Sequence, residues 1–63
     1  MTPEQMIEKE VVRRGMTLRE TARRSGVKYS ALQPSLHGKR KLRVPEYLAL
    51  CAMLNLNPRG YRD

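Results

Sequence analysis

Apolar residues along this chain recur at helical spacing in four stretches, and no stretch alternates apolar and polar positions as a half-buried strand does. The first stretch lies between Thr2 and Gly15, where Ile7 and Val11 fall about one helical turn apart. Thr2 is followed by a proline and, three residues after the threonine, by a glutamine, which is typical of a helix N-terminus. A glycine at the far end is a common helix stop. We therefore predict a first helix that closes at Gly15.

The stretch over residues 17–38 is the one around which the rest of the chain is organised. Thr17 precedes an amphipathic run, and Glu20 follows it at the spacing of a capping box. In that motif the threonine hydroxyl accepts from the N–H of Glu20, and the carboxylate accepts from the N–H of the threonine. We predict a helix at about Leu18 to Arg24, a tight turn at Ser25-Gly26, and another short helix that the next glycine ends. Two such helices form a helix-turn-helix.

The third predicted helix contains an awkward proline. Leu32 and Leu36 are four positions apart and face the core, and Pro34 lies between them. A proline in a helix interior removes a backbone hydrogen bond and costs about 3 kcal/mol, whereas in the first turn it costs little. Ser30, with a glutamine three residues later, repeats the capping spacing. We therefore expect this helix to begin at Ser30 or Ala31, or to be distorted there.

A fourth helix is predicted from Val44-Pro45-Glu46, with the proline at its first position, to Asn57-Pro58. Its core-facing stripe recurs at i, i+3, i+4 and i+7 and comprises Tyr47, Leu50, Cys51 and Leu54. Its other faces are also apolar, at Leu48, Ala49, Ala52, Met53 and Leu56. A helix that is apolar nearly all round is either central or meets a partner. Together the elements predict an all-α fold, a compact bundle of four or five short helices in one domain over residues 1–63, with Tyr61 folding back onto the core.

Basic residues are concentrated in the middle of the chain. The protein carries 13 Lys and Arg against six Asp and Glu, which gives a formal net charge of +7. Ten of the basic residues and one acid lie between Arg13 and Arg43, whereas the other positions hold three basic and five acidic residues. A patch of one sign on a small domain favours a polyanion as the partner.

The sequence carries few residues that support other chemistry. Cys51 is the one cysteine, so no disulfide forms within the chain, and it lies on the core stripe. His37 has no second histidine, cysteine or aspartate at ligand spacing, and no nucleophile–base set or Gly-rich phosphate loop is present. We therefore expect no metal, no cofactor and no enzymatic activity. No apolar run approaches the roughly 20 residues of a membrane span, and the charged N-terminal region is unlike a signal peptide. These features predict a complete cytoplasmic protein.

With these residues, the chain resembles the lambda-repressor-like family of phage and bacterial regulators, also called the Xre or Cro/C1 type. The resemblance runs from Met6 to Tyr61, and the segments that carry it are RRGMTLRETARRSGV, LHGKRK and LALCAMLNLNP. In order, these match a first helix followed by glycine and threonine, a helix with a central alanine, a Gly-Val turn, a recognition helix, a basic loop and an apolar helix. The resemblance implies a helix-turn-helix fold and binding to double-stranded DNA.

The chain departs from the pattern of that family at several positions. Many members place an arginine at the position of Val11 and a glutamate at that of Leu36, and the two commonly form a buried ion pair. Here both are apolar, which predicts that Val11 packs against Leu36. The glutamine that touches a phosphate in many members is replaced by Leu18. Polar residues or proline also occupy positions that are usually apolar or helical, at Thr21, Ser25, Ser35 and Pro34.

The resemblance implies a role for two groups of side chains. A recognition helix lies in the DNA major groove with its N-terminal residues against the base edges. The candidates for base contacts are Lys28, Tyr29, Ser30 and Gln33. The candidates for phosphate contacts are Arg19, Arg23, Lys39, Arg40, Lys41 and Arg43. Gln pairs bidentately with adenine and Lys donates to guanine, whereas phosphate contacts give affinity and register without sequence choice.

The interpretation that follows is a small Cro-type or Xre-type repressor, nucleoid-associated, that occludes a promoter as a homodimer on a two-fold operator. The candidate dimer surface is the extra apolar face of the fourth helix, at Ala49, Met53 and Leu56. Two alternatives stay open at this point. In one, the chain is an antitoxin-like or accessory module whose fourth helix binds a partner protein. In the other, it is a nonspecific or RNA-binding basic protein, although three tyrosines and no Phe or Trp offer few stacking platforms.

Overall fold

A computed structural model describes residues 2–58 and contains four α-helices and no strand in that range. The helices are α1 (Pro3–Arg13), α2 (Leu18–Ser25), α3 (Tyr29–Leu36) and α4 (Val44–Leu54). The predicted all-α bundle is therefore confirmed with four helices. The expected return of Tyr61 onto the core lies outside the described residues.

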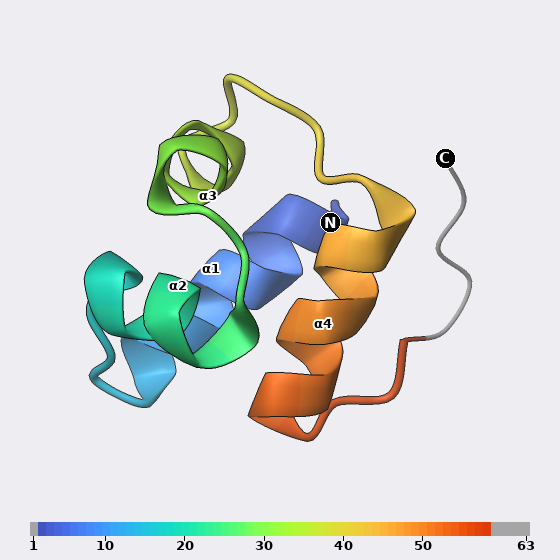
Figure 1. Cartoon of the computed structure of the whole chain (residues 1–63). Helices are drawn as coiled ribbons and strands as arrows, with labels where there is room; N and C mark the ends of the chain where they lie inside the picture. Colours follow the sequence, from blue (N-terminus) through green and yellow to red (C-terminus); the bar gives the residue numbers. More distant parts are fainter. Residues whose placement is uncertain (1, 59–63) are drawn as a thin grey trace.

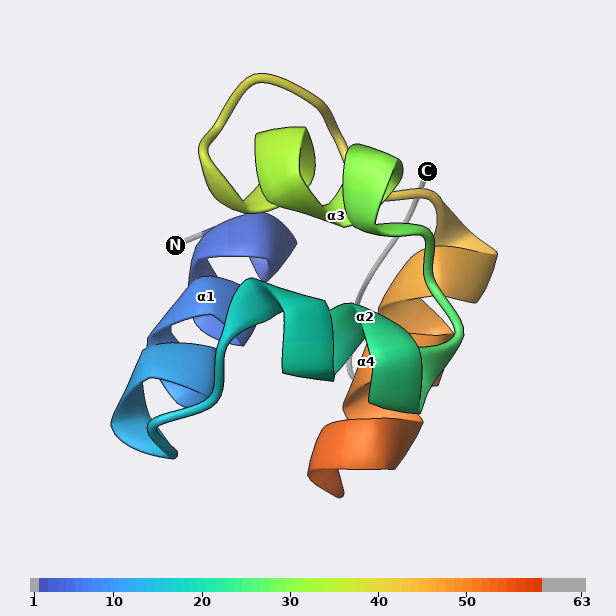
Figure 2. The same ribbon diagram turned by 60° about the vertical axis from the view of Figure 1, so that its left-hand side comes forward.

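The helices pack so that α3 lies at one side of the molecule (Figure 2). α3 lies over one side of the molecule, above α1 and α2, and α4 stands beside α2 (Figures 1 and 2). α1 and α2 each pack against both α3 and α4. The loop over residues 37–43 arches from the end of α3 to the start of α4 (Figure 1). One surface of α3 is thus free of other helices.

A single apolar core joins all four helices. It contains the buried residues Ile7, Val11, Ala22, Val27, Leu32, Leu36, Leu42, Tyr47, Leu50, Cys51 and Leu54. The predicted stripe of α4 is therefore confirmed, and Cys51 is a free, buried thiol within it. Val11 and Leu36, which the sequence predicts to pack together, both lie in this core and are 2% and 8% exposed. Burial of each such side chain contributes about 1.5–3 kcal/mol, and apolar packing here needs no buried charge.

Two threonines begin α1 and α2, as the sequence predicts. The N–H of Gln5 donates to Thr2 Oγ1 over 3.1 Å, and the N–H of Thr2 donates to the Gln5 side chain over 2.9 Å, which completes a capping box. The N–H of Glu20 donates to Thr17 Oγ1 over 3.0 Å. The Glu20 carboxylate, however, pairs with Arg23 and Arg24 instead of reaching back to Thr17. The second predicted capping box is therefore only half formed, because two guanidinium groups compete for the carboxylate.

Replacing Thr17 with alanine is expected to destabilise the protein by about 1 kcal/mol, because the N–H of Glu20 loses its only side-chain acceptor at the start of α2. The free energy of unfolding, measured in urea, tests this expectation. Thr17→Ser keeps the hydroxyl and is the matched control. Equal losses in the two variants would mean that the methyl group, and not the cap, carries the effect.

The third helix begins earlier than predicted. Lys28 is its N-cap, and its carbonyl accepts from the N–H groups of Ala31 and Leu32 over 3.0 and 2.9 Å. The prediction of a start at Ser30 or Ala31 is therefore wrong. Two buried residues on either side of this turn, Val27 and Leu32, fix the chain against the core and override the local preference of Pro34. The proline consequently lies inside α3, at its sixth residue.

The turn before α3 has the geometry that the sequence predicts. Gly26 has a φ of 79°, in the left-handed region that glycine adopts at little cost. Its N–H donates to the carbonyl of Ala22 over 2.9 Å, which ends α2. The two helices are therefore joined by a tight reversal at Ser25-Gly26.

Two hydroxyl side chains are buried in the core of the described residues. Thr21 and Ser35 are both 0% exposed. Thr21 donates to the carbonyl of Thr17, and Ser35 donates to that of Ala31, each over 2.8 Å. Because each hydroxyl is satisfied within its own helix, neither leaves an unpaired polar group in the core.

The limits of α4 also differ from the prediction. Val44 is its first residue and Pro45 its second, where a missing N–H still costs no helical bond. The helix ends at Leu54, before the predicted Asn57-Pro58, because Asn55 adopts a left-handed conformation with a φ of 59°. Arg14 donates to the carbonyl of Leu54 over 2.5 Å, so the ends of α1 and α4 are joined.

Candidate nucleic-acid interface

The four predicted base contacts lie at the start of α3, and all four are exposed. Lys28 is the N-cap, Tyr29 and Ser30 follow in the first turn, and Gln33 lies one turn further on. The opposite side of α3 is buried through Leu32, Ser35 and Leu36. All four side chains are thus open to solvent, and their contact with DNA stays a prediction.

An arginine of α2 stacks on this surface. The guanidinium carbon of Arg19 lies 4.7 Å from the centre of the Tyr29 ring, within range of a cation–π contact. Arg19, which is predicted to contact a phosphate, thus lies beside Tyr29, which is predicted to contact a base. It also restricts both side chains, so that each loses less conformational freedom when a ligand binds. The sequence places these two residues on separate helices and gave no signal for their pairing.

The other arginines of α2 are already paired. Arg23 Nη2 lies 2.8 Å from Glu20 Oε1, and Arg24 Nε lies 2.6 Å from Glu20 Oε2. The adjacent Arg23 guanidinium, followed by Arg24, keeps the pKa of the Glu20 carboxyl below its ordinary value. Both arginine side chains remain more than half exposed, at 72% and 57%. They are thus available at the surface, with part of their charge offset by one carboxylate.

The basic loop is held to the body of the protein at its C-terminal end, through two neighbouring residues. Leu42 is 1% exposed, and its N–H donates to Glu4 Oε2 of α1 over 2.7 Å. The N–H of Arg43 donates to Glu46 Oε1 over 2.9 Å, which caps α4. Two carboxylates from different helices therefore fix the backbone of this loop.

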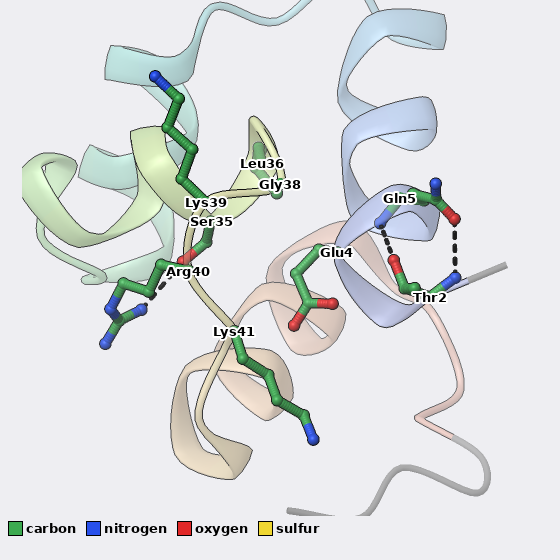
Figure 3. A pocket seen from close by; sticks show the side chains of 9 residues that line it. All are labelled: Thr2, Glu4, Gln5, Ser35, Leu36, Gly38, Lys39, Arg40 and Lys41. Atoms are coloured by element: carbon green, nitrogen blue, oxygen red, sulfur yellow. Dashed lines mark hydrogen bonds between the residues drawn. The ribbon is translucent and has the colours of Figure 1, made fainter.

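The basic side chains of the loop do not form one cluster. The side chains of Lys39 and Lys41 leave the loop in opposite directions (Figure 3). Lys39, Lys41 and Arg43 are exposed, whereas Arg40 is half-buried. Arg40 binds both oxygens of Glu46. Among the predicted phosphate contacts, the guanidinium of Arg40 is thus the one with a bidentate ion pair in the described structure.

Acid is expected to weaken the Arg40–Glu46 pair and thereby the fold. The Arg40 guanidinium, helped by the N–H of Arg43, holds the pKa of Glu46 below its ordinary value of 4.5. A carboxyl group whose pKa falls on folding stabilises the folded state above its unfolded-state pKa, and this contribution is lost as pH falls through the folded-state pKa. Thermal unfolding measured from neutral pH to about pH 2 should show the loss below the ordinary value, and Glu46→Gln should make the decline shallower.

Glu8→Gln is the matched control for the acid experiment. Glu8 is exposed on α1 and has no ion pair or hydrogen bond to its side chain among the described residues. We expect this variant to keep the acid profile of the parent protein. The expectation fails if both glutamine variants change the profile equally.

The predicted dimer surface on α4 is largely covered within one copy of the protein. Ala49 and Met53 of α4 are half-buried and pack against the core, as does Leu56, which lies beyond the end of the helix. The exposed apolar strip of α4 lies on another face, at Pro45, Leu48 and Ala52, where residues three, four and seven apart are neighbours. Leu48 is 46% exposed. The sequence could not distinguish these faces because every side of the helix is apolar.

The described residues contain no group of three or more His, Cys, Asp or Glu placed to hold a metal ion. No helix within residues 2–58 is long and apolar enough to cross a membrane. No protein-family profile, curated protein or solved structure matches this chain.

Proposed function

We propose that this protein is a sequence-specific double-stranded DNA-binding regulator of the cytoplasm and nucleoid, a small repressor similar to the Cro/Xre type. The observation that carries the proposal is the exposed set at the start of α3, at Lys28, Tyr29, Ser30 and Gln33. An α-helix fits the major groove, and its N-terminal residues reach the base edges there. Within residues 2–58, no other helix lies on the side of α3 that faces away from α1 and α2 (Figure 2).

The distribution of charge supports the same proposal. Of the basic residues between Arg13 and Arg43, three lie on α2, Lys28 is the N-cap of α3, and four lie in the loop that follows α3. In a complex, Arg19, Arg23, Lys39, Lys41 and Arg43 neutralise phosphates on either side of the groove. Each phosphate that a basic side chain neutralises releases counterions and steepens the dependence of affinity on salt.

A dimer completes the proposal, because one copy of such a domain reads only a few base pairs. Two copies on a two-fold operator place their recognition helices about 34 Å apart, one turn of DNA. The exposed strip of α4 around Leu48, together with the half-covered Ala49, Met53 and Leu56, is the surface we assign to the second copy. Binding over a promoter then represses transcription by occlusion. Crosslinking that finds only monomer, with and without DNA, removes the dimer from the proposal.

The experiment that tests the function is fluorescence anisotropy with duplexes tiled from the DNA that flanks the protein's own gene, at two salt concentrations. A regulator binds one tile at least about 10³-fold more tightly than the others. Uniform weak binding that collapses at the higher salt concentration would contradict sequence-specific recognition and leave only a nonspecific polycation.

A second candidate function is an antitoxin-like or accessory module that binds a protein. The exposed apolar strip of α4 favours it, since Leu48 lies on a helix whose exposed face carries no charge. Copurification of a stoichiometric partner chain that Leu48→Glu abolishes, together with the absence of a preferred DNA tile, selects this function over the first.

A further inference from the structure

One side chain of the basic loop has a different environment from the others. Arg40 Nη1 donates to Glu46 Oε1 over 2.9 Å, and Arg40 Nη2 donates to Glu46 Oε2 over 3.0 Å. Arg40 Nη1 also donates to Ser35 Oγ over 2.9 Å. The side chains of Arg40 and Glu46 are 31% and 21% exposed, respectively. The parallel geometry of guanidinium and carboxylate is the strong, directional form of an ion pair.

This network connects three segments of the fold. Ser35 is fully buried in α3, and its own hydroxyl donates to the carbonyl of Ala31 over 2.8 Å. Glu46 lies in the first turn of α4, and its carboxylate also accepts from the N–H of Arg43. Arg40 thus lies between α3 and α4 and fixes the loop to both (Figure 3 shows its bond to Ser35).

We infer that Arg40 is a positioning residue, which sets α3 and the basic loop relative to α4, and that it does not contact a phosphate. The inference rests on the proposed function and deepens it, because it separates one member of the basic loop from its neighbours. The bonds to Glu46 and Ser35 occupy three of the five N–H groups of the Arg40 guanidinium, and a phosphate that took these N–H groups would break the link between α3 and α4. Lys39 and Lys41 have no such bonds among the described residues and carry the contacts to DNA.

The two possible roles of Arg40 predict opposite effects for the removal of Glu46's charge. If Arg40 contacts a phosphate, Glu46→Gln releases it and tightens binding to every duplex. If Arg40 positions α3, Glu46→Gln and Arg40→Gln cause the same defect, although one removes a negative and the other a positive charge. Glutamine at position 46 keeps an oxygen that accepts from the N–H of Arg43, so the cap of α4 survives.

The test compares Arg40→Gln, Glu46→Gln and the double variant on the preferred duplex and on a scrambled one, over a range of salt concentrations. We expect each single variant to lower the ratio of specific to nonspecific affinity about 10-fold, with no further loss in the double variant. The salt slope is the steepness with which log affinity falls as log salt concentration rises. It should be the same for Arg40→Gln and the parent protein. Lys39→Gln is the reference for a true phosphate contact, which lowers the slope by about 0.9 and leaves the ratio unchanged.

A slope that falls by about 0.9 in Arg40→Gln, with an unchanged ratio and tighter binding by Glu46→Gln, would overturn the inference. Failure of the proposed function is detected separately, as the lack of any preferred duplex for the parent protein. In that case the positioning role is tested without DNA. The melting temperature and the amide exchange at Leu42 and Arg43 are then measured in the parent protein, the two single variants at Arg40 and Glu46, and the double variant. Non-additive losses and faster exchange support the role, and additive losses refute it.

Discussion

Replacing Gln33 with alanine is expected to lower affinity for the preferred duplex by about 5- to 150-fold, which corresponds to about 1–3 kcal/mol. Gln33 is exposed on α3, one turn beyond the N-terminal residues that we propose to enter the major groove. Its amide offers one donor and one acceptor, the pattern that adenine presents in the major groove. Loss of the amide leaves that base edge without its partners.

The backbone around Gln33 should tolerate this substitution. Its carbonyl accepts from the N–H of His37 and faces the His37 ring nitrogen Nδ1, so the end of α3 depends on the backbone and not on the amide. Because Gln33 is neutral, binding to a scrambled duplex and the salt slope should stay as in the parent protein. Anisotropy on both duplexes at several salt concentrations measures these quantities together.

The matched control is Lys39→Gln, which removes a charge from the loop and keeps α3 intact. It should weaken binding to both duplexes alike and reduce the salt slope by about 0.9. Equal losses on the two duplexes in Gln33→Ala would contradict direct base recognition by this side chain. Gln33 would then be an exposed polar residue that takes no part in base recognition.

The parts of the fold that local chemistry determines could be predicted from the sequence. A hydroxyl at Thr2 or Thr17 can reach only the first turn that follows it, so both helix starts are visible in the order of residues. The stripe of α4 is equally local, because one helix face repeats at fixed spacing. The start of α3 is different, since burial of Val27 and Leu32 against other helices outweighs the local signals at Ser30 and Pro34.

The exposure of the four residues at the start of α3 could be predicted from the sequence, but the contacts between side chains could not. The basic residues and the outward side of α3 follow from composition and periodicity. No spacing rule joins Arg40 to Glu46, six positions away across a loop, or Arg19 to Tyr29 on the next helix. Both contacts depend on how α3 lies against its neighbours. Composition alone does not distinguish Arg40 and Arg19 from the other basic residues, whereas these contacts do.

Replacing Pro34 with alanine is expected to stabilise the protein by about 1–2 kcal/mol. The proline is the sixth residue of α3 and has no N–H to donate to the carbonyl of Ser30. Alanine restores that donor and removes the clash of the ring, a gain of up to about 3 kcal/mol in a helix interior. Greater freedom of the unfolded chain and lost contacts of the half-buried ring offset part of this gain, by about 1–2 kcal/mol.

The melting temperature measures this gain, and for a domain of this size each kcal/mol raises it by about 4–8 °C. Pro45→Ala is the matched control, because Pro45 is the second residue of α4, where the missing N–H has no helical acceptor. We expect the control to leave the melting temperature unchanged or slightly lower. An unchanged or lower melting temperature for Pro34→Ala would mean that α3 has already adjusted around the ring. In that case the proline sets the shape of the recognition surface at little cost to stability, and the substitution should change the preferred duplex instead.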